Sequence, residues 1–220
     1  MKFDVAYALK ALPALLHGAV VTVEAALLAV LLGVVVGVVL ALMRQSGIRA
    51  LHYLAAAHIS LARGTPLFIQ ILIVYYALPA IHLDVPRFAA GVIALSLNGG
   101  AYIAEMIRGG LSAIPRGQLD AARAFAMPRS LVWRHIILPQ VFVLILPPLT
   151  VEFSALLKAS SLLSVIAVIE LTRTAQGIIS DSFRPIEIWI VTGLLYFVMC
   201  FSLGAVTRRL ERLAAVWRPV

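Results

Sequence analysis

Long apolar stretches alternate with shorter polar ones along the 220 residues of this chain. Five of the apolar stretches are long enough to predict membrane-spanning helices, which need about 20 apolar residues. They cover approximately residues 18–43, 51–80, 88–108, 136–157 and 187–206. The pattern therefore predicts an all-α integral membrane protein with five transmembrane helices, forming a single domain over residues 1–220.

Three of the predicted spans carry residues that interrupt helices. The second span is cut at residues 63–66 (Arg-Gly-Thr-Pro), the third at residues 98–100 (Asn-Gly-Gly) and the fourth at residues 147–148 (Pro-Pro). Proline lacks a backbone N–H and glycine weakens a helix, so we expect broken helices at these points. The backbone groups freed at such breaks must face protein or a wet cavity.

Two further segments read as amphipathic helices outside the hydrocarbon core. Residues 1–17, interrupted at Pro13, are expected to form an uncleaved interfacial segment ahead of the first span. Residues 165–180 alternate apolar and polar positions at helical spacing and are expected to form the second such helix.

The third and fourth spans are joined by a long polar connection, residues 109–135. Within it, residues 117–127 predict a short helix between Pro115 and Pro128, because proline is tolerated at a first turn but stops a helix interior. Apolar residues recur there at three-to-four spacing, so the helix is amphipathic. The pattern fits two alternatives. The helix lies flat on the membrane with its arginines on lipid phosphates, or it projects and docks into a soluble protein.

Composition and charge agree with a membrane protein. With 62% hydrophobic residues, 13% charged residues and a mean hydropathy of +1.02, the chain is not an ordinary soluble domain. Its net charge of +8 also occurs in nucleic-acid-binding proteins. Here, however, the basic residues are spread over short loops without interleaved aromatic residues, and nucleic acid is not an expected partner.

The distribution of basic residues predicts the orientation in the membrane. Eleven arginines lie after the first span, in the connection that starts at Arg108, and in the C-terminal segment. The opposite side has six lysines and arginines, with Arg63 left out of the count. Because basic residues accumulate in cytoplasmic loops, we expect the N-terminus outside and the C-terminus in the cytoplasm.

Polar side chains within the apolar stretches form a candidate substrate path. An ionised acid at the bilayer centre costs about 2.5–3.5 kcal/mol, so such groups should face protein or water. Broken helices that line a cavity can hold a zwitterion, with helix N-termini facing its carboxylate and acids facing its ammonium. Each of these polar residues also has a structural alternative, such as bridging two helices. The candidates are Thr65, Gln70, Asn98, Glu152, Ser160 and Glu24.

Several spaced motifs together resemble a known family. Residues 117–127 (GQLDAARAFAM), followed by Ile136 and by Leu138-Pro139, are similar to the cytoplasmic signature loop of ABC importer permeases. The motifs RGTP (63–66), GAYIAEMIRGG (100–110) and LPQ (138–140) resemble the polar-amino-acid branch, which takes up histidine, glutamine or arginine. The resemblance covers nearly the whole chain. It implies that residues 117–127 form a coupling helix that contacts an ATPase through Gly117, Gln118, Asp120, Ala121, Ala122, Ala126 and Met127.

The resemblance also implies the partners and the place of the chain. It implies a type I ABC importer permease in the bacterial inner membrane, paired with a second permease subunit that is identical or related. Two ATPase subunits would grip the coupling helices, and a periplasmic or lipid-anchored binding protein would deliver the amino acid. The chain lacks a glycine-rich phosphate loop that ends in Gly-Lys-Ser/Thr, so ATP and Mg²⁺ are expected on the partner ATPase. We expect no cofactor, metal or catalytic residue in this chain.

The chain departs from the family pattern at four positions. Asp120 replaces a glutamate but keeps the negative charge near the helix start. Ala126 replaces a glycine that either supplies a positive φ or allows close approach to the partner. The helix-favouring run around Ala126 favours close approach. Val151 and Ala159 replace polar residues beside Glu152 and Ser160, which changes the surroundings of the candidate path.

A proton-coupled secondary carrier is the alternative function. Glu24, Glu105 and Glu152 would then act as relay groups, although five spans without an inverted repeat make a small carrier. An intramembrane enzyme has less support, since the five histidines show no spacing such as His-Glu-x-x-His. The transported amino acid is left open. Acids in the path favour a cationic amino acid, yet an acid equally holds the α-ammonium of any amino acid.

Overall fold

The computed structural model describes residues 4–214, without the side chains at positions 210 and 212–214. Lys2 and Arg218, and the side chain of Arg212, all counted above, therefore lie outside the described residues. A π-helix (Trp133–Ile137) and a 3-10 helix (Ser160–Ile166) flank the seventh α-helix. The α-helices are α1 (Val5–Gln45), α2 (Arg49–Gly64), α3 (Leu67–Ala80), α4 (Arg87–Ser112), α5 (Arg116–Ala124), α6 (Arg129–Val132), α7 (Leu138–Ala159), α8 (Leu171–Ser182) and α9 (Pro185–Ala214).

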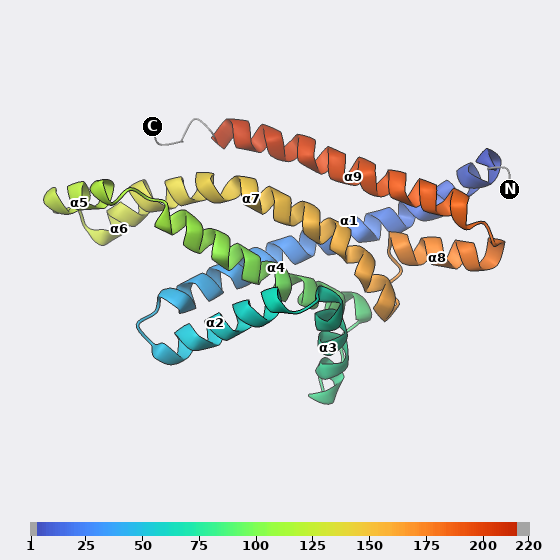
Figure 1. Cartoon of the computed structure of the whole chain (residues 1–220), viewed down its shortest axis with the longest axis horizontal. Coiled ribbons are helices and arrows are strands. Elements are labelled where there is room, and N and C mark those ends of the chain that lie inside the picture. Colours follow the sequence, from blue (N-terminus) through green and yellow to red (C-terminus); the bar gives the residue numbers. More distant parts are fainter. Residues whose placement is uncertain (1–3, 215–220) are drawn as a thin grey trace.

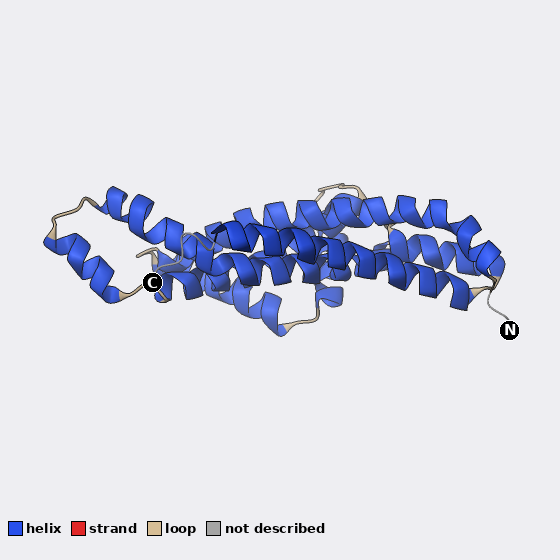
Figure 2. Ribbon diagram, turned by 90° about the horizontal axis from the view of Figure 1, so that it is seen from above, coloured by secondary structure: helices blue, strands red, loops and turns tan. Residues whose placement is uncertain are grey.

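Long helices running side by side form an elongated bundle (Figures 1 and 2). Four helical stretches of the described chain are long and apolar enough to cross a membrane: α1, α4, residues 129–166 and α9. The N-terminal end of α1 and all of α8 lie at one end of the bundle, and α5 and α6 lie at the other (Figure 1). The predicted all-α membrane fold is confirmed.

The first helix is longer than predicted. α1 begins at Val5 and continues through Pro13 to Gln45, so the interruption expected at Pro13 is wrong, whereas the interfacial position of residues 1–17 stays a prediction. Asp4 caps the helix by accepting a hydrogen bond from the N–H of Tyr7 (3.0 Å), and its carboxylate pairs with Arg184. The buried Leu15 packs against residues of α8 and α9. These contacts hold the first turns in line with the rest of the helix.

One of the three predicted helix breaks is present. Thr65 and Pro66 are extended and separate α2 from α3, inside the interval of residues 63–66. α3 then turns across the bundle axis and projects from its side instead of continuing α2 (Figure 1).

The breaks predicted at residues 98–100 and 147–148 are wrong, because α4 and α7 run through them without interruption. The glycines of α4 instead allow close packing on α1. A Cβ atom on Gly100 would lie 2.5 Å from the Val36 Cγ1 atom, and one on Gly37 would lie 2.6 Å from the Ile103 Cγ2 atom. In α7, neighbouring helices support the two prolines, a tolerance usual for membrane helices. α7 is contacted by α1, α4 and α9.

The amphipathic helix predicted over residues 165–180 begins later. A 3-10 helix runs to Ile166, and Ala167 takes the left-handed conformation with φ 57°, so α8 starts only at Leu171. The buried Glu170 caps α8 by accepting hydrogen bonds from the N–H groups of Thr172 (2.9 Å) and Arg173 (2.8 Å). The capping side chain of Glu170 determines where α8 begins. A pattern of apolar positions does not reveal such a cap.

Glu170 is also the centre of a buried network that joins three helices. Its carboxylate accepts a hydrogen bond from the hydroxyl of Tyr196 on α9 (3.1 Å) and lies 3.4 Å from the hydroxyl of Thr22 on α1. Burial raises the pKa of the Glu170 carboxyl, and the four hydrogen bonds to its oxygens oppose that rise. The Thr22 hydroxyl accepts a further bond from the N–H of Leu171 (3.1 Å).

Replacing Thr22 by valine is expected to lower the free energy of unfolding by about 1–3 kcal/mol, because the buried N–H of Leu171 loses its acceptor. Thermal unfolding in detergent measures the loss. Thr192→Val is the matched control, since the buried Thr192 hydroxyl only donates to the Ile188 carbonyl of its own helix (2.7 Å). Equal losses in the two variants would contradict a special role for Thr22.

Candidate functional site

A small lobe built from α5 and α6 projects beyond the end of the bundle (Figures 1 and 2). It has its own apolar centre, in which Ile114, Ile137 and Val141 are buried and Leu119 packs against them. Gln140 of α7 donates a hydrogen bond to the side-chain oxygen of Gln118 on α5 (2.6 Å). The lobe is therefore tied to α7 as well as to α4, which leads into it.

The helix predicted over residues 117–127 ends early. α5 stops at Ala124, and the N–H groups of Met127 and Ala126 donate to the carbonyls of Ala122 (3.0 Å) and Arg123 (2.9 Å). This pair of bonds is a Schellman motif, which closes a helix through one left-handed residue. Ala126 is that residue, with φ 50°. The interpretation of its position as one of close approach within a helix is therefore wrong: the backbone there needs a positive φ.

Replacing Ala126 by glycine is expected to stabilise this turn by about 1 kcal/mol, because an L-residue pays about 1–2 kcal/mol in the left-handed region and glycine does not. Transport should be retained. Hydrogen exchange of the Met127 amide measures the stability of the turn. Ala124→Gly, inside α5, is the control and should destabilise the loop, because glycine is a poor helix former. Faster exchange at Met127 in Ala126→Gly would contradict the expectation.

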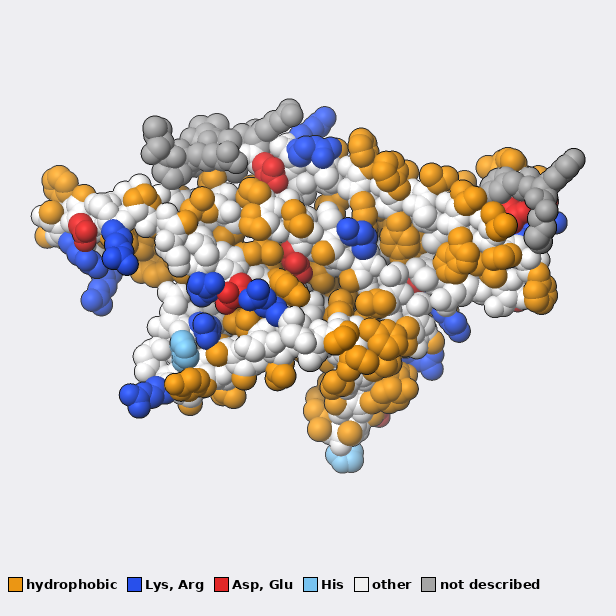
Figure 3. Space-filling model, viewed as in Figure 1, with side chains coloured by type: hydrophobic (Ala, Val, Ile, Leu, Met, Phe, Trp, Pro, Cys, Tyr) orange, Lys and Arg blue, Asp and Glu red, His pale blue; other side chains and the backbone are white. Residues whose placement is uncertain are grey.

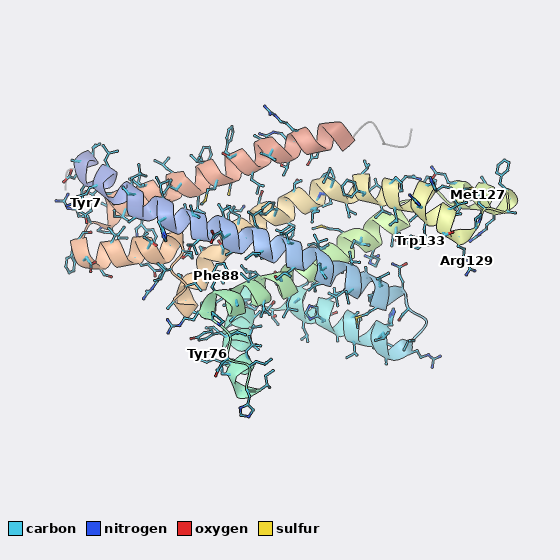
Figure 4. All side chains as sticks on the ribbon, turned by 180° about the vertical axis from the view of Figure 1, so that it is seen from behind. Tyr7, Tyr76, Phe88, Met127, Arg129 and Trp133 are labelled. Atoms are coloured by element: carbon cyan, nitrogen blue, oxygen red, sulfur yellow. The ribbon has the colours of Figure 1, made fainter. Side chains whose placement is uncertain are left out.

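The predicted ATPase-contact residues divide between the surface and the interior of the lobe. Ala122 is buried, Gln118 is directed to Gln140, and Met127 is half-buried at the turn labelled in Figure 4. Phe125, which was not among the predicted contact residues, directly follows α5, and its side chain is 82% exposed beside the Schellman turn. The left-handed residue that follows turns the chain and leaves this ring outside. The exposed members of the predicted set are Gly117, Asp120, Ala121 and Ala126.

The lobe continues into the bundle without a gap in helical structure. α6 passes into the π-helix over Trp133–Ile137 and then directly into α7. A π-turn holds one residue more than an α-turn and often lies at functional positions. α6 of the lobe and Glu152 on α7 therefore belong to one continuous helical stretch.

Polar side chains gather at the break between α2 and α3. Gln70 of α3 donates to the carbonyls of Ala62 (2.8 Å) and Thr65 (3.0 Å) and to the hydroxyl of Thr65 (2.9 Å). Asn98 of α4 donates to the Ala62 carbonyl (3.1 Å) and to the Gln70 side-chain oxygen (3.1 Å). Three of the predicted path residues, Thr65, Gln70 and Asn98, therefore form one network that satisfies backbone carbonyls freed by the break.

The other three predicted path residues lie in different surroundings. Glu152 is half-buried on α7. One of its carboxylate oxygens lies 3.5 Å from the position that a Cβ atom on Gly99, the neighbour of Asn98, would take. Ser160 is fully buried, and its hydroxyl donates to the Leu157 carbonyl (2.8 Å). Glu24 is exposed on α1. Glu152 thus faces Gly99 on the side of α4 that packs against α7, and Ser160 and Glu24 lie outside the network at the break.

A hollow of about 250 Å³ opens in the elbow between α2 and α3, lined by Thr65, Gln70 and His58 among apolar side chains. The His58 ring nitrogen lies 3.1 Å from the Leu97 carbonyl on α4. Polar groups at the hollow thus come from both sides of the helix break, which is an arrangement suited to a small polar ligand.

The chain matches known proteins over nearly its whole length. Residues 29–216 match the binding-protein-dependent transport system inner membrane component family. The chain belongs to this family. This inner membrane component is 36% identical over 214 residues to the glutamine transport system permease protein GlnP of Escherichia coli (strain K12), covering 96% of the chain and 98% of the relative. It is 33% identical over 213 residues to the arginine transport system permease protein ArtQ of Bacillus subtilis (strain 168), covering 96% and 97%.

Solved structures agree with this placement. The inner membrane component superposes on a crystal structure of an amino acid ABC transporter with histidines with a TM-score of 0.90 and 38% identity, covering 96% of this chain and 99% of that one. An inward-facing MetNI methionine ABC transporter shares the fold, with a TM-score of 0.74 and 20% identity. The predicted resemblance to ABC importer permeases is confirmed. The family placement does not favour the proton-coupled carrier.

Proposed function

We propose that this chain is the translocation subunit of an ATP-driven importer for polar amino acids in the bacterial inner membrane. The glutamine, arginine and L-cystine transport permeases to which it is similar support amino acids as the substrate class. The observation that carries the proposal is the projecting α5 lobe, which presents an exposed aromatic ring on a rigid turn and joins α7 through continuous helix.

Coupling follows from the geometry of the lobe. A partner ATPase would hold α5 and the turn at Ala126, with Phe125 as the apolar anchor and Asp120 as a charged contact. Closure of the ATPase dimer would then push the lobe as a unit, because its apolar centre and the Gln118–Gln140 bond tie it to the bundle. α4 and α7, attached at its two ends, would move with it and alternate the access of the path.

The substrate path is centred on the break between α2 and α3. The amide groups of Gln70 and Asn98 and the Thr65 hydroxyl offer neutral donors and acceptors for a zwitterion, and Glu152 offers a negative charge for its ammonium. Such groups beside a broken helix are typical of substrate sites in transporters. Glu152 also suits a cationic side chain, so cationic amino acids are included in the substrate class.

The remaining partners follow from the same assignment. A second permease subunit, identical or related, would complete the path, ATP and Mg²⁺ would be held by the ATPase, and a binding protein would deliver the amino acid. Lys and Arg side chains gather near the end that carries α5 and the start of α2 (Figure 3). This distribution supports a cytoplasmic position for that end and an external N-terminus.

Uptake into proteoliposomes tests the proposal. The chain is reconstituted with its ATPase and its binding protein, and labelled glutamine, arginine, histidine and cystine are offered with and without ATP. We expect uptake that requires ATP and persists with a protonophore. Uptake that proceeds without ATP and stops with the protonophore would contradict the importer and support a proton-coupled carrier.

A further inference from the structure

A second polar cavity lies at the ends of three helices, apart from the break between α2 and α3. It has a volume of about 240 Å³ and lies between the last turns of α1, the first half of α2 and the last turns of α4. Glu105 on its wall follows Asn98 by two helical turns, about 10 Å along α4. The polar residues that line it are Arg44, Gln45, His52, Glu105 and Arg108.

The charges around this cavity are unbalanced. Arg108 donates two hydrogen bonds to one Glu105 oxygen (2.8 and 3.0 Å), and Arg63 lies 3.6 Å from the same oxygen. Arg44 lines the cavity as a third arginine, and its side chain forms no ion pair or hydrogen bond with the described residues. Three guanidinium groups therefore face one carboxylate.

The other groups that face the cavity add no negative charge. The Nδ1 atom of His52 lies 2.8 Å from the Arg44 carbonyl, to which it donates, and a histidine ring carries no negative charge. Gln45 donates to the Ala41 carbonyl of its own helix (3.4 Å). A surplus of two positive charges next to a cavity is an electrostatic complement to an oxyanion.

Exposed apolar side chains lie on the same ends of α1 and α2 as the cavity. Leu42 and Ile48 near the end of α1 are 62% and 60% exposed, and Tyr53 on α2 is 68% exposed. Apolar side chains together with a tyrosine at the end of a membrane helix are typical of the boundary between acyl chains and headgroups. Arginine, glutamate and histidine side chains gather on this face beside orange apolar ones (Figure 3).

We propose that this cavity binds the phosphate of an anionic phospholipid headgroup. The guanidinium groups of Arg44 and Arg108 match phosphate oxygens in charge and geometry, and basic pockets between membrane helices bind such headgroups. The acyl chains then lie along the exposed apolar surface beside Tyr53, the neighbour of His52, and Glu105 is a positioning residue that orients Arg108. The proposal rests on the membrane position of the chain and not on the amino acid that it transports.

Native mass spectrometry of the purified permease–ATPase complex tests the site. Dioleoyl phosphatidylglycerol and dioleoyl phosphatidylcholine, which share acyl chains and differ in charge, are titrated against each other. We expect the wild type to retain phosphatidylglycerol preferentially. Arg44→Gln should reduce that preference roughly fivefold, the factor for about 1 kcal/mol per arginine near anionic lipid. Arg108→Gln should do the same.

Arg49→Gln is the matched control, because Arg49 is exposed at the start of α2 and does not line the cavity. It should keep the preference within twofold. Arg44→Gln carries the test if Arg108→Gln fails to fold, since Arg44 holds no ion pair that folding would lose. An unchanged preference in Arg44→Gln, or an equal loss in Arg49→Gln, would overturn the site.

Competition separates the lipid from other oxyanions. Inorganic phosphate at about 10 mM is roughly ten times a millimolar Kd, the value of a weak site. At this concentration it is expected to leave bound phosphatidylglycerol in place. Displacement by inorganic phosphate would assign the cavity to a free anion and overturn the lipid. Displacement by L-arginine or L-glutamine would assign it to the carboxylate of a transported amino acid, which also overturns the lipid.

Discussion

Replacing Glu152 by glutamine is expected to reduce ATP-driven amino-acid uptake about 10- to 100-fold. Glu152 is half-buried on α7 and faces α4 at Gly99, the residue that follows Asn98. A hydrogen bond to a charged partner contributes about 1.5–3 kcal/mol, and glutamine keeps the size of the side chain while removing its charge. Initial rates of uptake in proteoliposomes, measured over a range of amino-acid concentrations, give the effect on KM and on kcat.

Glu24→Gln is the comparison for this variant, because it makes the same chemical change at an exposed position of α1. It is expected to leave KM unchanged within about twofold, since an exposed group forms only weak interactions with charges. An equal loss in both variants would place Glu24 in the path. Full uptake in Glu152→Gln would remove Glu152 from it.

Replacing Phe125 by alanine is expected to weaken binding of the partner ATPase by about 30-fold or more. Aromatic anchors at the centre of an interface typically contribute 2 kcal/mol or more when truncated, and this ring is 82% exposed in the isolated chain. The same exposure means that the fold loses little packing. Retention of the ATPase on the immobilised permease measures the effect directly, and uptake should fall in parallel.

Phe183→Ala is the matched control for Phe125→Ala. Phe183 is 80% exposed, like Phe125, but follows α8 at the opposite end of the bundle (Figure 1). Its removal should leave ATPase retention unchanged, whatever its effect on the external side. Retention that is unaffected in Phe125→Ala, or reduced equally in Phe183→Ala, would contradict the anchor role of Phe125.

The elements that depend on local hydrophobic pattern could be predicted from the sequence. Apolar stretches of span length predicted the long helices, and the Arg-Gly-Thr-Pro interruption predicted the break between α2 and α3. Motif spacing identified the coupling lobe and the family. Gln70 was predicted as a path residue together with Thr65, and the hydrogen bond between their side chains brings the two together at the break.

The features that depend on tertiary contacts could not be predicted in this way. Gly99 and Gly100 have the same local preference whether they break a helix or pack against neighbouring helices, here Leu156 of α7 and Val36 of α1. The start of α8 depends on a buried carboxyl, Glu170, whose partners come from α1 and α9. The conformation of Ala126 was visible only as a departure from the family glycine, and the helix-favouring residues around it outweighed that signal.

The π-helix at Trp133–Ile137 sets the angular position of the coupling lobe about the axis of α7. Each residue of an α-helix turns the chain by about 100° and advances it by about 1.5 Å. Removal of one residue from this segment, with return to regular α-helix, would therefore swing Phe125 about a quarter-turn away from its present direction while Glu152 stayed in place. The direction in which the lobe presents Phe125, relative to Glu152 on α7, thus depends on one additional residue in the π-helix.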